Sequence, residues 1–276
     1  MEKIIKLALE EDLSSRGDVT SQAIFDDESA DFSLIAKDEG ILCGSEYFKN
    51  VFAQIDEEIS IKFLFKDGDK IHTSDIIAKL SGCVMSILKG ERVALNFLSH
   101  LSGIASKTAK YVYIAGGNTK ILDTRKTIPC LRKAEKYAVK CGGGVNHRMG
   151  LYDMVLIKDN HIDAAGSITK AVEKVRDKFG DEFKIEVETR NLPEVQAACD
   201  CKVDRIMLDN MNNATMIKAI AICDGKVEVE ASGNMNMERV KEVSNLALDY
   251  ISIGELTHTL HSFDFSLQYK DANKLK

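Results

Sequence analysis

The chain has 276 residues, an apolar share of 45% and a formal net charge of −6. This length fits one large domain or two modest ones, and the apolar share is ordinary for a globular protein with a sizeable core. The acidic balance argues against a general nucleic-acid-binding protein. No apolar run reaches the roughly 18 residues that a membrane-spanning helix needs.

The N-terminal sequence MEKIIKLALEEDL lacks the apolar centre of a signal peptide and predicts an amphipathic helix, so we expect a cytoplasmic protein. The seven cysteines are scattered and odd in number, which favours reduced thiols over a disulfide framework. Cys199 and Cys201 form an isolated C-x-C pair. Because structural zinc sites usually need four ligands, we expect no zinc there.

A mixed pattern of strands and helices is predicted up to about Leu88. The opening helix is followed by one more predicted helix, Ser45–Gln54, and by strands near Phe32–Lys37, Ile59–Phe65 and Asp75–Leu80. The sequence KDGDK between the last two strands is a turn signal. From Gly90 to Ala115, apolar residues recur at three- and four-residue steps, which predicts a long helix.

From Thr119 onward, short apolar runs alternate with amphipathic helical segments. The runs are KILDT, DMVLIKD, FKIEVET, RIMLDN, KVEVEAS and DYISIGE. Pro129 and Pro193 lie near two predicted helix starts, where proline is tolerated, and Asn212 is a plausible N-cap. This alternation predicts βαβ units and a parallel sheet. Six such units favour a closed barrel of six to seven strands, with an open doubly wound sheet as the alternative.

Nearly every apolar run ends in polar residues. These are Arg125–Lys126, Lys158, Glu188, Asp209, Ser232–Gly233–Asn234 and Gly254–Glu255. In a right-handed succession of βα units, all of these strand ends emerge on one side, where barrels build their active sites. Any one of these residues could be a solvated loop residue, but the series predicts a shared polar cavity.

The segment from Asp123 to Ile162 is cationic within an acidic chain, with eight lysines and arginines against four acids. Such side chains recognise carboxylates and phosphates, and the turns at Ser232–Asn234 and Ile253–Gly254 suit a phosphate at a helix start. Glu188 and Asp209 suit sugar hydroxyls, a metal or a developing cation. We therefore expect a polyanionic ligand with hydroxyls, such as a phosphorylated sugar.

Several residues of the cationic segment have simpler interpretations. Gly142–Gly144 can merely close the helix that starts near Pro129. The basic residues of that helix, Arg132, Lys133, Lys136 and Lys140, are predicted to form partly a solvated face, and His72 and His100 are expected to be structural. Lys158 differs because it ends an apolar strand, so we expect its amine to project into the cavity.

The stretch TRKTIPCLRKAEKYAVKCGGGVNHRMGLYDMVLIKDNHI closely resembles the signature of quinolinate phosphoribosyltransferase, the decarboxylating nicotinate-nucleotide pyrophosphorylase. GERVALNFLSHLSGIAS, IEVET, IMLDNM, EASGN and YISIGELTHT also resemble that family, in order and spacing. The resemblance covers most of the chain from Gly90 to Thr259, and EEDLSSRGDVTS is similar to the family's N-terminal segment.

The resemblance implies a fold and a reaction. The fold is an N-terminal α/β sandwich over residues 1–112, onto which residues 260–276 pack back, and an incomplete α/β barrel of six to seven strands over residues 113–259. The reaction joins quinolinate to phosphoribosyl pyrophosphate and gives nicotinate mononucleotide, pyrophosphate and carbon dioxide, with Mg²⁺. The resemblance also implies a homodimer, or a higher oligomer, whose sites are completed across the interface.

By the same resemblance, Arg125, His147 and Arg148 hold the carboxylates of quinolinate, together with Arg92 of the partner subunit. Thr124 is a further substrate-binding residue, and Lys126 and Lys158 meet carboxylate and phosphate groups. Glu188 and Asp209 address the ribose hydroxyls and lie near Mg²⁺, which is held mainly through the substrate rather than by direct protein ligands. Ser232, Gly233, Asn234, Ile253, Gly254 and Glu255 line the 5′-phosphate site. The catalytic residues are Lys126, Lys158, Glu188 and Asp209.

Two other functions fit parts of the pattern. Lys158 at a barrel strand end could form a Schiff base, as in an aldolase, although an aldolase does not need so many anion-binding groups. A non-enzymatic phosphosugar-binding protein would bind tightly without turnover.

Overall fold

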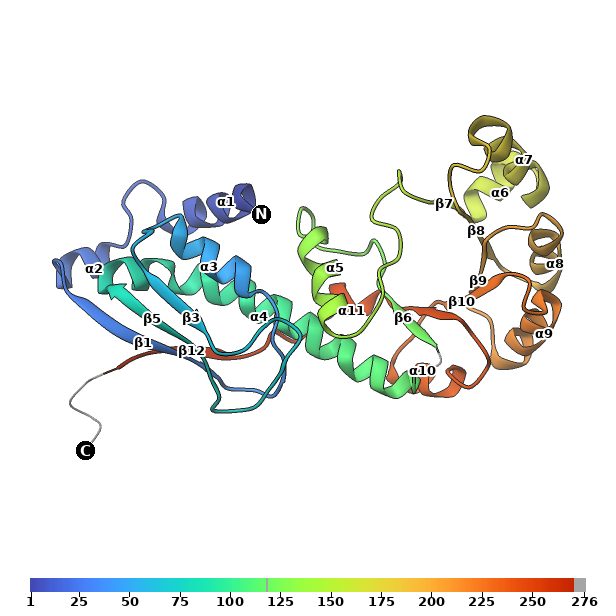
Figure 1. Cartoon of the computed structure of the whole chain (residues 1–276). Coiled ribbons are helices and arrows are strands. Elements are labelled where there is room, and N and C mark those ends of the chain that lie inside the picture. Colours follow the sequence, from blue (N-terminus) through green and yellow to red (C-terminus); the bar gives the residue numbers. More distant parts are fainter. Residues whose placement is uncertain (118, 271–276) are drawn as a thin grey trace. The chain divides into compact units, whose positions relative to one another are not determined.

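The computed structural model describes residues 1–117 and 119–270, and no helix within them is long and apolar enough to cross a membrane. The chain forms two compact units. Of the described residues, the first comprises Met1–Lys107, Tyr137–Gly143 and residues 260–270; the second comprises Thr108–Lys136 and Gly144–Thr259 (Figure 1).

The first unit is built on a four-stranded antiparallel sheet in the order β12-β1-β5-β3. Its strands are β1 (Ser29–Ala36), β3 (Ser60–Phe63), β5 (Ile76–Cys83) and β12 (Phe265–Tyr269), and a separate ribbon pairs β2 (Gly40–Ile41) with β4 (Lys70–Ile71). The helices that begin here are α1 (Glu2–Leu13), α2 (Val19–Ile24), α3 (Ser45–Ala53) and α4 (Val84–Ala115).

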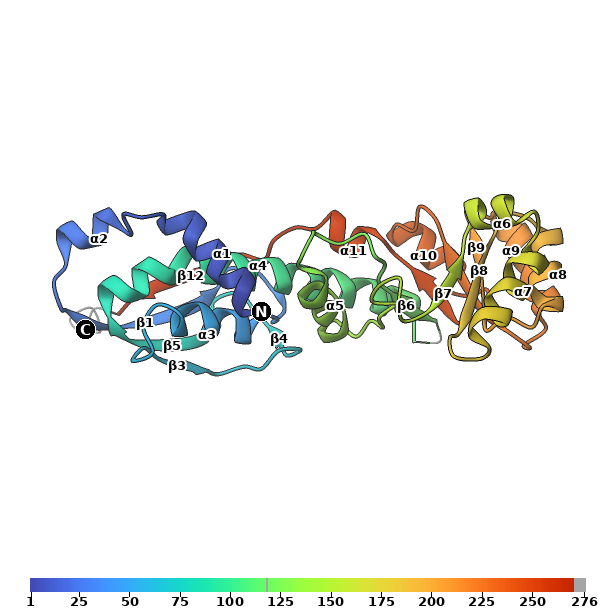
Figure 2. The same ribbon diagram turned by 90° about the horizontal axis from the view of Figure 1, so that it is seen from above.

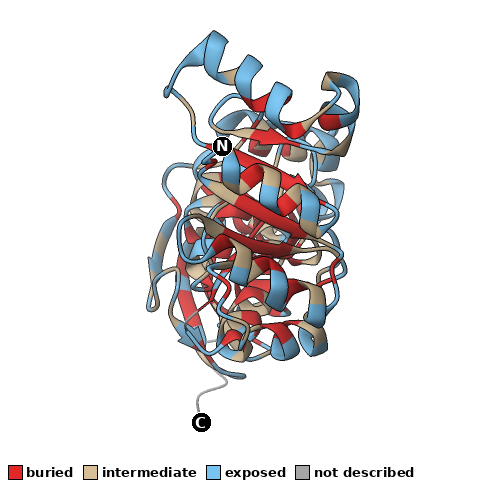
Figure 3. Ribbon diagram, turned by 90° about the vertical axis from the view of Figure 1, so that its right-hand side faces the viewer, coloured by how far each residue is buried: buried red, intermediate tan, exposed pale blue. Residues whose placement is uncertain are grey.

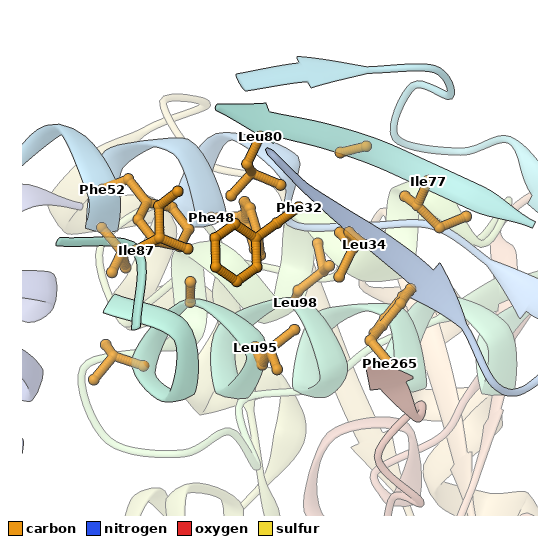
Figure 4. Packing of buried hydrophobic residues seen from close by; sticks show 14 of the residues in the cluster. Phe32, Leu34, Phe48, Phe52, Ile77, Leu80, Ile87, Leu95, Leu98 and Phe265 are labelled. Carbon is orange, nitrogen blue, oxygen red and sulfur yellow. The ribbon is translucent and has the colours of Figure 1, made fainter. Parts of the chain in front are cut away.

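The core of the first unit lies between the sheet and helices α3 and α4. Figure 4 shows Phe32, Leu34 and Leu80 of the sheet facing side chains from these helices. From the helices, Phe48, Phe52, Ile87, Leu95 and Leu98 complete the cluster, and Phe265 joins from β12. These side chains are almost completely buried, and fully burying one of this size stabilises the fold by about 1.5–3 kcal/mol.

The second unit contains a six-stranded parallel sheet in the order β6-β11-β10-β9-β8-β7. The strands are β6 (Lys120–Leu122), β7 (Val155–Ile157), β8 (Ile185–Thr189), β9 (Arg205–Asp209), β10 (Glu228–Ser232) and β11 (Tyr250–Ser252). Edge strand β6 gains one further parallel bridge, from Leu122 to Val145. The incomplete α/β barrel of six to seven strands that the resemblance implies is therefore confirmed, with six strands among the described residues. The closed barrel expected from the strand pattern is wrong, because the two edge strands β6 and β7 do not pair with each other.

Helices connect successive strands of this sheet. They are α5 (Arg132–Cys141), α6 (Asp159–Ala165), α7 (Ile168–Phe179), α8 (Leu192–Asp200), α9 (Asn213–Cys223), α10 (Met237–Val243) and α11 (Glu255–His258). Figures 1 and 2 both show α7, α8 and α9 along one side of strands β7 to β9. Asn212 caps α9 as predicted, because its Oδ1 accepts the N–H of Thr215 at 2.9 Å, and Pro193 lies in the first turn of α8.

Alternation along the strands separates two faces of this sheet. The apolar residues Ile206, Leu208 and Val229 are buried on the face toward the helices, where Figure 3 shows buried residues concentrated on the strands and the inner sides of helices. Residues two apart point to the other face. On β8 these are Glu186 and Glu188, on β9 Arg205, Met207 and Asp209, and on β10 Glu228, Glu230 and Ser232. The interior of the barrel is therefore polar and is arranged in layers along the strands.

Candidate active site

A cavity of about 860 Å³ lies in the second unit at the carboxyl ends of the parallel strands. Cavities of this size accommodate cofactor-sized ligands. It is lined by Thr124, Arg125, Lys126, His147, Arg148, Leu156, Lys158, Glu188, Met207, Asp209, Asn210, Ser232, Gly233, Asn234, Met235, Asn236, Ser252, Gly254, Glu255 and His258. Residues from the ends of all six strands or from the turns beyond them contribute, as expected for a barrel that builds its site from strand ends.

Most residues singled out in the sequence meet in this cavity, but two do not line it. Ile253 is 1% exposed, and its backbone N–H donates to the carbonyl of Leu122, so it supports β11 from behind the cavity. Arg92 lies on α4 in the first unit and is not among the lining residues. Of the turn Ile253–Glu255, only Gly254 and Glu255 therefore line the cavity.

Basic side chains line one part of the cavity. Lys158 follows β7, and its Nζ donates to Oε2 of Glu188 at 2.7 Å. Lys126 is fixed through its backbone, because its N–H donates to Thr124 Oγ1 at 3.0 Å and its carbonyl accepts the hydroxyl of Thr257 at 2.7 Å. Its side chain therefore remains available to a ligand.

Arg148 is largely buried, and its Nη1 donates to the carbonyl of Met154 at 3.1 Å. Burial lowers the pKa of its guanidinium, and the neighbouring charge of Arg125 lowers it further. Both effects are relieved when an anion binds between the two arginines. The pair is therefore suited to a carboxylate, which a guanidinium binds through two parallel hydrogen bonds.

A buried ion pair fixes the segment that carries His147 and Arg148. Lys136 of α5 and Asp123 after β6 are both fully buried and in direct contact. The Asp123 carboxylate also accepts the N–H of His147 at 2.9 Å, and Lys136 Nζ donates to the carbonyl of His147 at 2.9 Å. The expectation that the basic residues of this helix form a solvated face is therefore wrong for Lys136, which reaches inward to a buried carboxylate.

The His147 ring is held at Nδ1, which accepts the N–H of Arg148 at 2.7 Å and so leaves the proton of the neutral ring on Nε2. Nε2 lies 3.0 Å from Oε2 of Glu186, but within the described chain it makes no hydrogen bond. Burial lowers the pKa of His147, so a neutral ring agrees with this geometry. His147 thus lines the cavity with Nδ1 held by the backbone and Nε2 close to a buried carboxyl group.

Glu186 of β8 and Glu230 of β10 point to the same interior face of the barrel and lie close together beside His147. Arg205 Nη1 donates to Oε2 of Glu230 at 3.2 Å, and His147 Nε2 lies 3.7 Å from the same oxygen. Burial raises the pKa of Glu186 to about 7 and that of Glu230 to about 8. At neutral pH this layer therefore retains a proton. Sequence reasoning did not identify these residues, although Glu186 repeats the period-two pattern of Glu188 in IEVET.

The turn after β10 is shaped for a small anion. Gly233 has a φ of 94°, and a Cβ at this position would lie 2.2 Å from Oδ1 of Asn210. Asn234 Nδ2 donates to the same oxygen at 3.2 Å. Within residues 1–117 and 119–270, the backbone N–H groups of Gly233, Asn234 and Met235 have no acceptor. Successive N–H groups of this kind form a concavity that binds phosphate.

The fold and the cavity define an α/β-barrel protein with a site for a phosphorylated, hydroxyl-bearing ligand, as in phosphoribosyltransferases. Comparison with known families gives two matches: the quinolinate phosphoribosyl transferase C-terminal domain over residues 104–268 and the N-terminal domain over residues 18–102. The chain therefore belongs to the quinolinate phosphoribosyltransferase family, the decarboxylating pentosyltransferases of de novo NAD biosynthesis. This confirms the family and the reaction class predicted from the sequence.

Individual relatives match over nearly the whole chain. The probable nicotinate-nucleotide pyrophosphorylase of Bacillus subtilis is 40% identical over 275 residues, which cover 99% of this chain and 95% of the relative. The chloroplastic enzyme of that name from Arabidopsis thaliana is 41% identical, covering 97% of this chain and 82% of the relative. The crystal structure of NadC from Streptococcus pyogenes is 45% identical with a TM-score of 0.94, covering 98% of this chain and 97% of that chain.

Proposed function

We propose that the cavity transfers the phosphoribosyl group of phosphoribosyl pyrophosphate to the ring nitrogen of quinolinate, with loss of pyrophosphate and carbon dioxide. The observation that carries this proposal is the convergence of Arg125, Lys126, Arg148 and Lys158 on one cavity that also contains Glu188 and Asp209. The cations match two polyanionic substrates, and the carboxylates match the hydroxyls of the sugar.

In this proposal, the two arginines hold the carboxylates of quinolinate. Arg148 is the buried member, and Arg125 is its cationic neighbour. His147 belongs to the same subsite, and the Nδ1 atom of its neutral ring holds the Arg148 backbone in place. Lys158 and Lys126 meet the remaining carboxylate and phosphate charge, and Thr124 fixes the Lys126 backbone.

The 5′-phosphate would occupy the turn Ser232–Gly233–Asn234 and the start of α11 at Gly254–Glu255. Three backbone N–H groups and a left-handed Gly233 form the first part of this subsite. A side chain at Gly254 would lie 2.9 Å from Cδ of Lys126, so the glycine allows that lysine to cross the turn. Asp209 and Glu188, at the ends of neighbouring strands, would then face the ribose hydroxyls.

The chemistry requires no nucleophilic side chain. Cleavage of the C1–oxygen bond gives pyrophosphate its electron pair and leaves an oxocarbenium-like ribose, which the fixed carboxylates of Glu188 and Asp209 stabilise. The quinolinate nitrogen then donates its lone pair to C1. The resulting pyridinium accommodates the electron pair left at C2 when the carboxylate departs as carbon dioxide, and a proton from water replaces it. Positioning both substrates can supply up to roughly 7–11 kcal/mol of the barrier.

We propose Mg²⁺ as the accompanying cation. Glu188 and Asp209 offer carboxylate oxygens in the cavity, and Mg²⁺ is commonly held by one or two carboxylates together with substrate phosphates. These residues therefore fit an ion that is bound mainly through the substrate, with no direct protein ligand required. When bound, it neutralises the charge of the departing pyrophosphate.

We also propose that the two units of each chain correspond to the two predicted domains. In the proposed homodimer, Arg92 of the partner subunit reaches the quinolinate subsite. The proposal is supported by the assignment of Arg92 on α4 to the first unit, whereas the strand ends that supply the other substrate groups belong to the second unit.

The decisive experiment is incubation of the purified protein with quinolinate, phosphoribosyl pyrophosphate and MgCl₂, followed by identification of the products by mass. Nicotinate mononucleotide and carbon dioxide in equal amounts are the expected result. Binding of both substrates without turnover would instead support a phosphosugar-binding protein. Nicotinate in place of quinolinate is the matched control, since it lacks the C2 carboxylate.

A further inference from the structure

Three side chains with metal-ligating atoms meet in the first unit, outside the substrate cavity. Cys43 precedes α3, Asp67 lies in the turn between β3 and β4, and Cys141 is the last residue of α5. Their two Sγ atoms and a carboxylate oxygen all lie within 4.8 Å of one another. The three residues come from distant parts of the sequence, and none of them takes part in the proposed reaction.

The carboxylate of Asp67 is firmly oriented in this cluster. Its Oδ2 accepts the N–H of Gly44 at 3.0 Å and the hydroxyl of Tyr137 at 3.1 Å, and its Oδ1 accepts the N–H of Ser45 at 3.1 Å. Each oxygen has more than one acceptor direction, so these bonds leave capacity for another partner. They also hold the carboxylate in place at the start of α3.

The cluster gathers acidic groups without a cation. Within the described chain, the Asp67 carboxylate accepts hydrogen bonds but forms no ion pair. The Cys43 and Cys141 sulfur atoms lie beside it, and all three ligand atoms are within 4.8 Å of one another. A bound divalent cation would replace the thiol protons and balance the charge of the three groups.

We propose that Cys43, Asp67 and Cys141 bind one thiophilic divalent cation of the Zn²⁺ class. Two thiolates and a carboxylate are suitable ligands for Zn²⁺, and ligand atoms of a tetrahedral site lie roughly 3.5–4 Å apart, within the observed limit. Cys141 and Asp67 are only partly buried, so water completes the fourth position. The ion links the end of α5 to the start of α3 and to the turn that contains Asp67, and it stabilises the first unit.

The chain offers an internal control. Cys199 and Cys223 also bring two sulfur atoms together, at 3.8 Å, but the described residues place no third ligand of this kind beside them. If two nearby thiols were sufficient, both pairs would bind the cation. If the carboxylate completes the site, only the pair around Asp67 should bind it tightly.

The test uses the full-length protein, reduced and freed of metal with a chelator under anaerobic conditions. Titration with Co²⁺ should give one equivalent of a species with thiolate-to-cobalt charge-transfer absorption and intense tetrahedral d–d bands. Competition with a chromophoric Zn²⁺ indicator then gives the affinity. Cys141→Ser and Asp67→Asn should each weaken binding at least tenfold, whereas Cys199→Ser should leave it unchanged.

Zn²⁺ should also raise the unfolding temperature of the wild-type protein and of Cys199→Ser, but not that of Cys141→Ser. This second readout uses the half-buried Cys141, so it does not depend on substituting the fully buried Cys43. The proposal is overturned if the reduced protein binds less than one equivalent, if Cys141→Ser binds as tightly as wild type, or if loss of Cys199 abolishes the cobalt spectrum.

Discussion

The imidazole Nε2 of His147 lies 3.0 Å from Oε2 of Glu186, on the layer of side chains next to the substrate cavity. Because Nδ1 of the same ring accepts the N–H of Arg148, the ring stands between a buried carboxyl group and the backbone of an arginine that lines the cavity. Glu186 is two residues from the cavity-lining Glu188 on β8, so Glu186 and His147 both lie next to the cavity.

Glu186→Ala should raise the KM for quinolinate about tenfold, while the KM for phosphoribosyl pyrophosphate changes much less. Removing the carboxyl group frees the His147 ring and loosens the Arg148 backbone, and tenfold corresponds to about 1.4 kcal/mol. Glu186→Gln keeps an oxygen in this position and should retain most of the affinity. Steady-state kinetics with each substrate varied in turn provide the measurement. Equal losses in the two variants would argue against positioning through the ring.

Glu230→Gln should make the protein less sensitive to rising pH. Burial raises the pKa of Glu230 to about 8, so its stabilising contribution is fully present below the unfolded pKa of about 4.5 and is lost as pH rises to about 8. A glutamine cannot ionise. The unfolding free energy of the variant minus that of the wild type should therefore increase by about 2 to 5 kcal/mol as pH rises across this window.

Urea unfolding, followed by circular dichroism at several pH values, measures this difference. Burial lowers the pKa of His147, which makes stability fall as pH falls below about 6.5 in both proteins, so this opposing effect largely cancels in the comparison. A difference that stays constant between about pH 5 and about pH 9 would contradict the prediction.

Arg148→Ala should weaken quinolinate binding by about 2–5 kcal/mol, because one partner of a charge-assisted pair in a closed site is lost. Arg125→Ala should have a similar effect. Lys133→Ala is the matched control, since Lys133 belongs to the same basic segment but is exposed. Isothermal titration with quinolinate gives the affinities. Equal rates of turnover of nicotinate and quinolinate by the wild-type protein would refute recognition of the C2 carboxylate.

Lys158→Arg should keep some substrate binding and lose much of the rate, whereas Lys158→Ala should lose both. Arginine retains the charge but replaces a compact ammonium, 2.7 Å from Glu188, by a larger planar group. Borohydride reduction of the working wild-type enzyme should leave its mass unchanged. A stable substrate adduct at Lys158 would instead establish Schiff-base chemistry.

Mixing two inactive variants should test the shared site. If Arg92 serves the partner's cavity, Arg92→Ala and Lys158→Ala subunits together should regain activity, because one site in each mixed dimer has all its residues. Subunit exchange must be verified with differently tagged chains. Exchange without any recovery of activity would exclude a contribution of Arg92 across the interface.

The sequence alone determined the parallel sheet and the location of its site. Apolar runs such as DMVLIK and RIMLD end in polar residues, and parallel strands of a right-handed βα succession must present those ends on one side. Lys158, Glu188, Asp209 and Ser232 therefore meet in the cavity for a reason that is local in the sequence. The pattern within each segment was sufficient to locate these residues, because the position of a strand end depends only on the sequence of its own strand.

Only the tertiary structure decided which charged residues are buried and with what partner. Lys136 has the spacing of a solvated helix face, yet it contacts Asp123 inside the barrel unit. Glu186 and Glu230 meet through the register of three neighbouring strands, and Cys43 approaches Cys141 through helix packing. Such pairings join distant segments, and burial of a charge is tolerated only when its partner arrives with it. No pattern within one segment contains that information, because it resides in the packing of several.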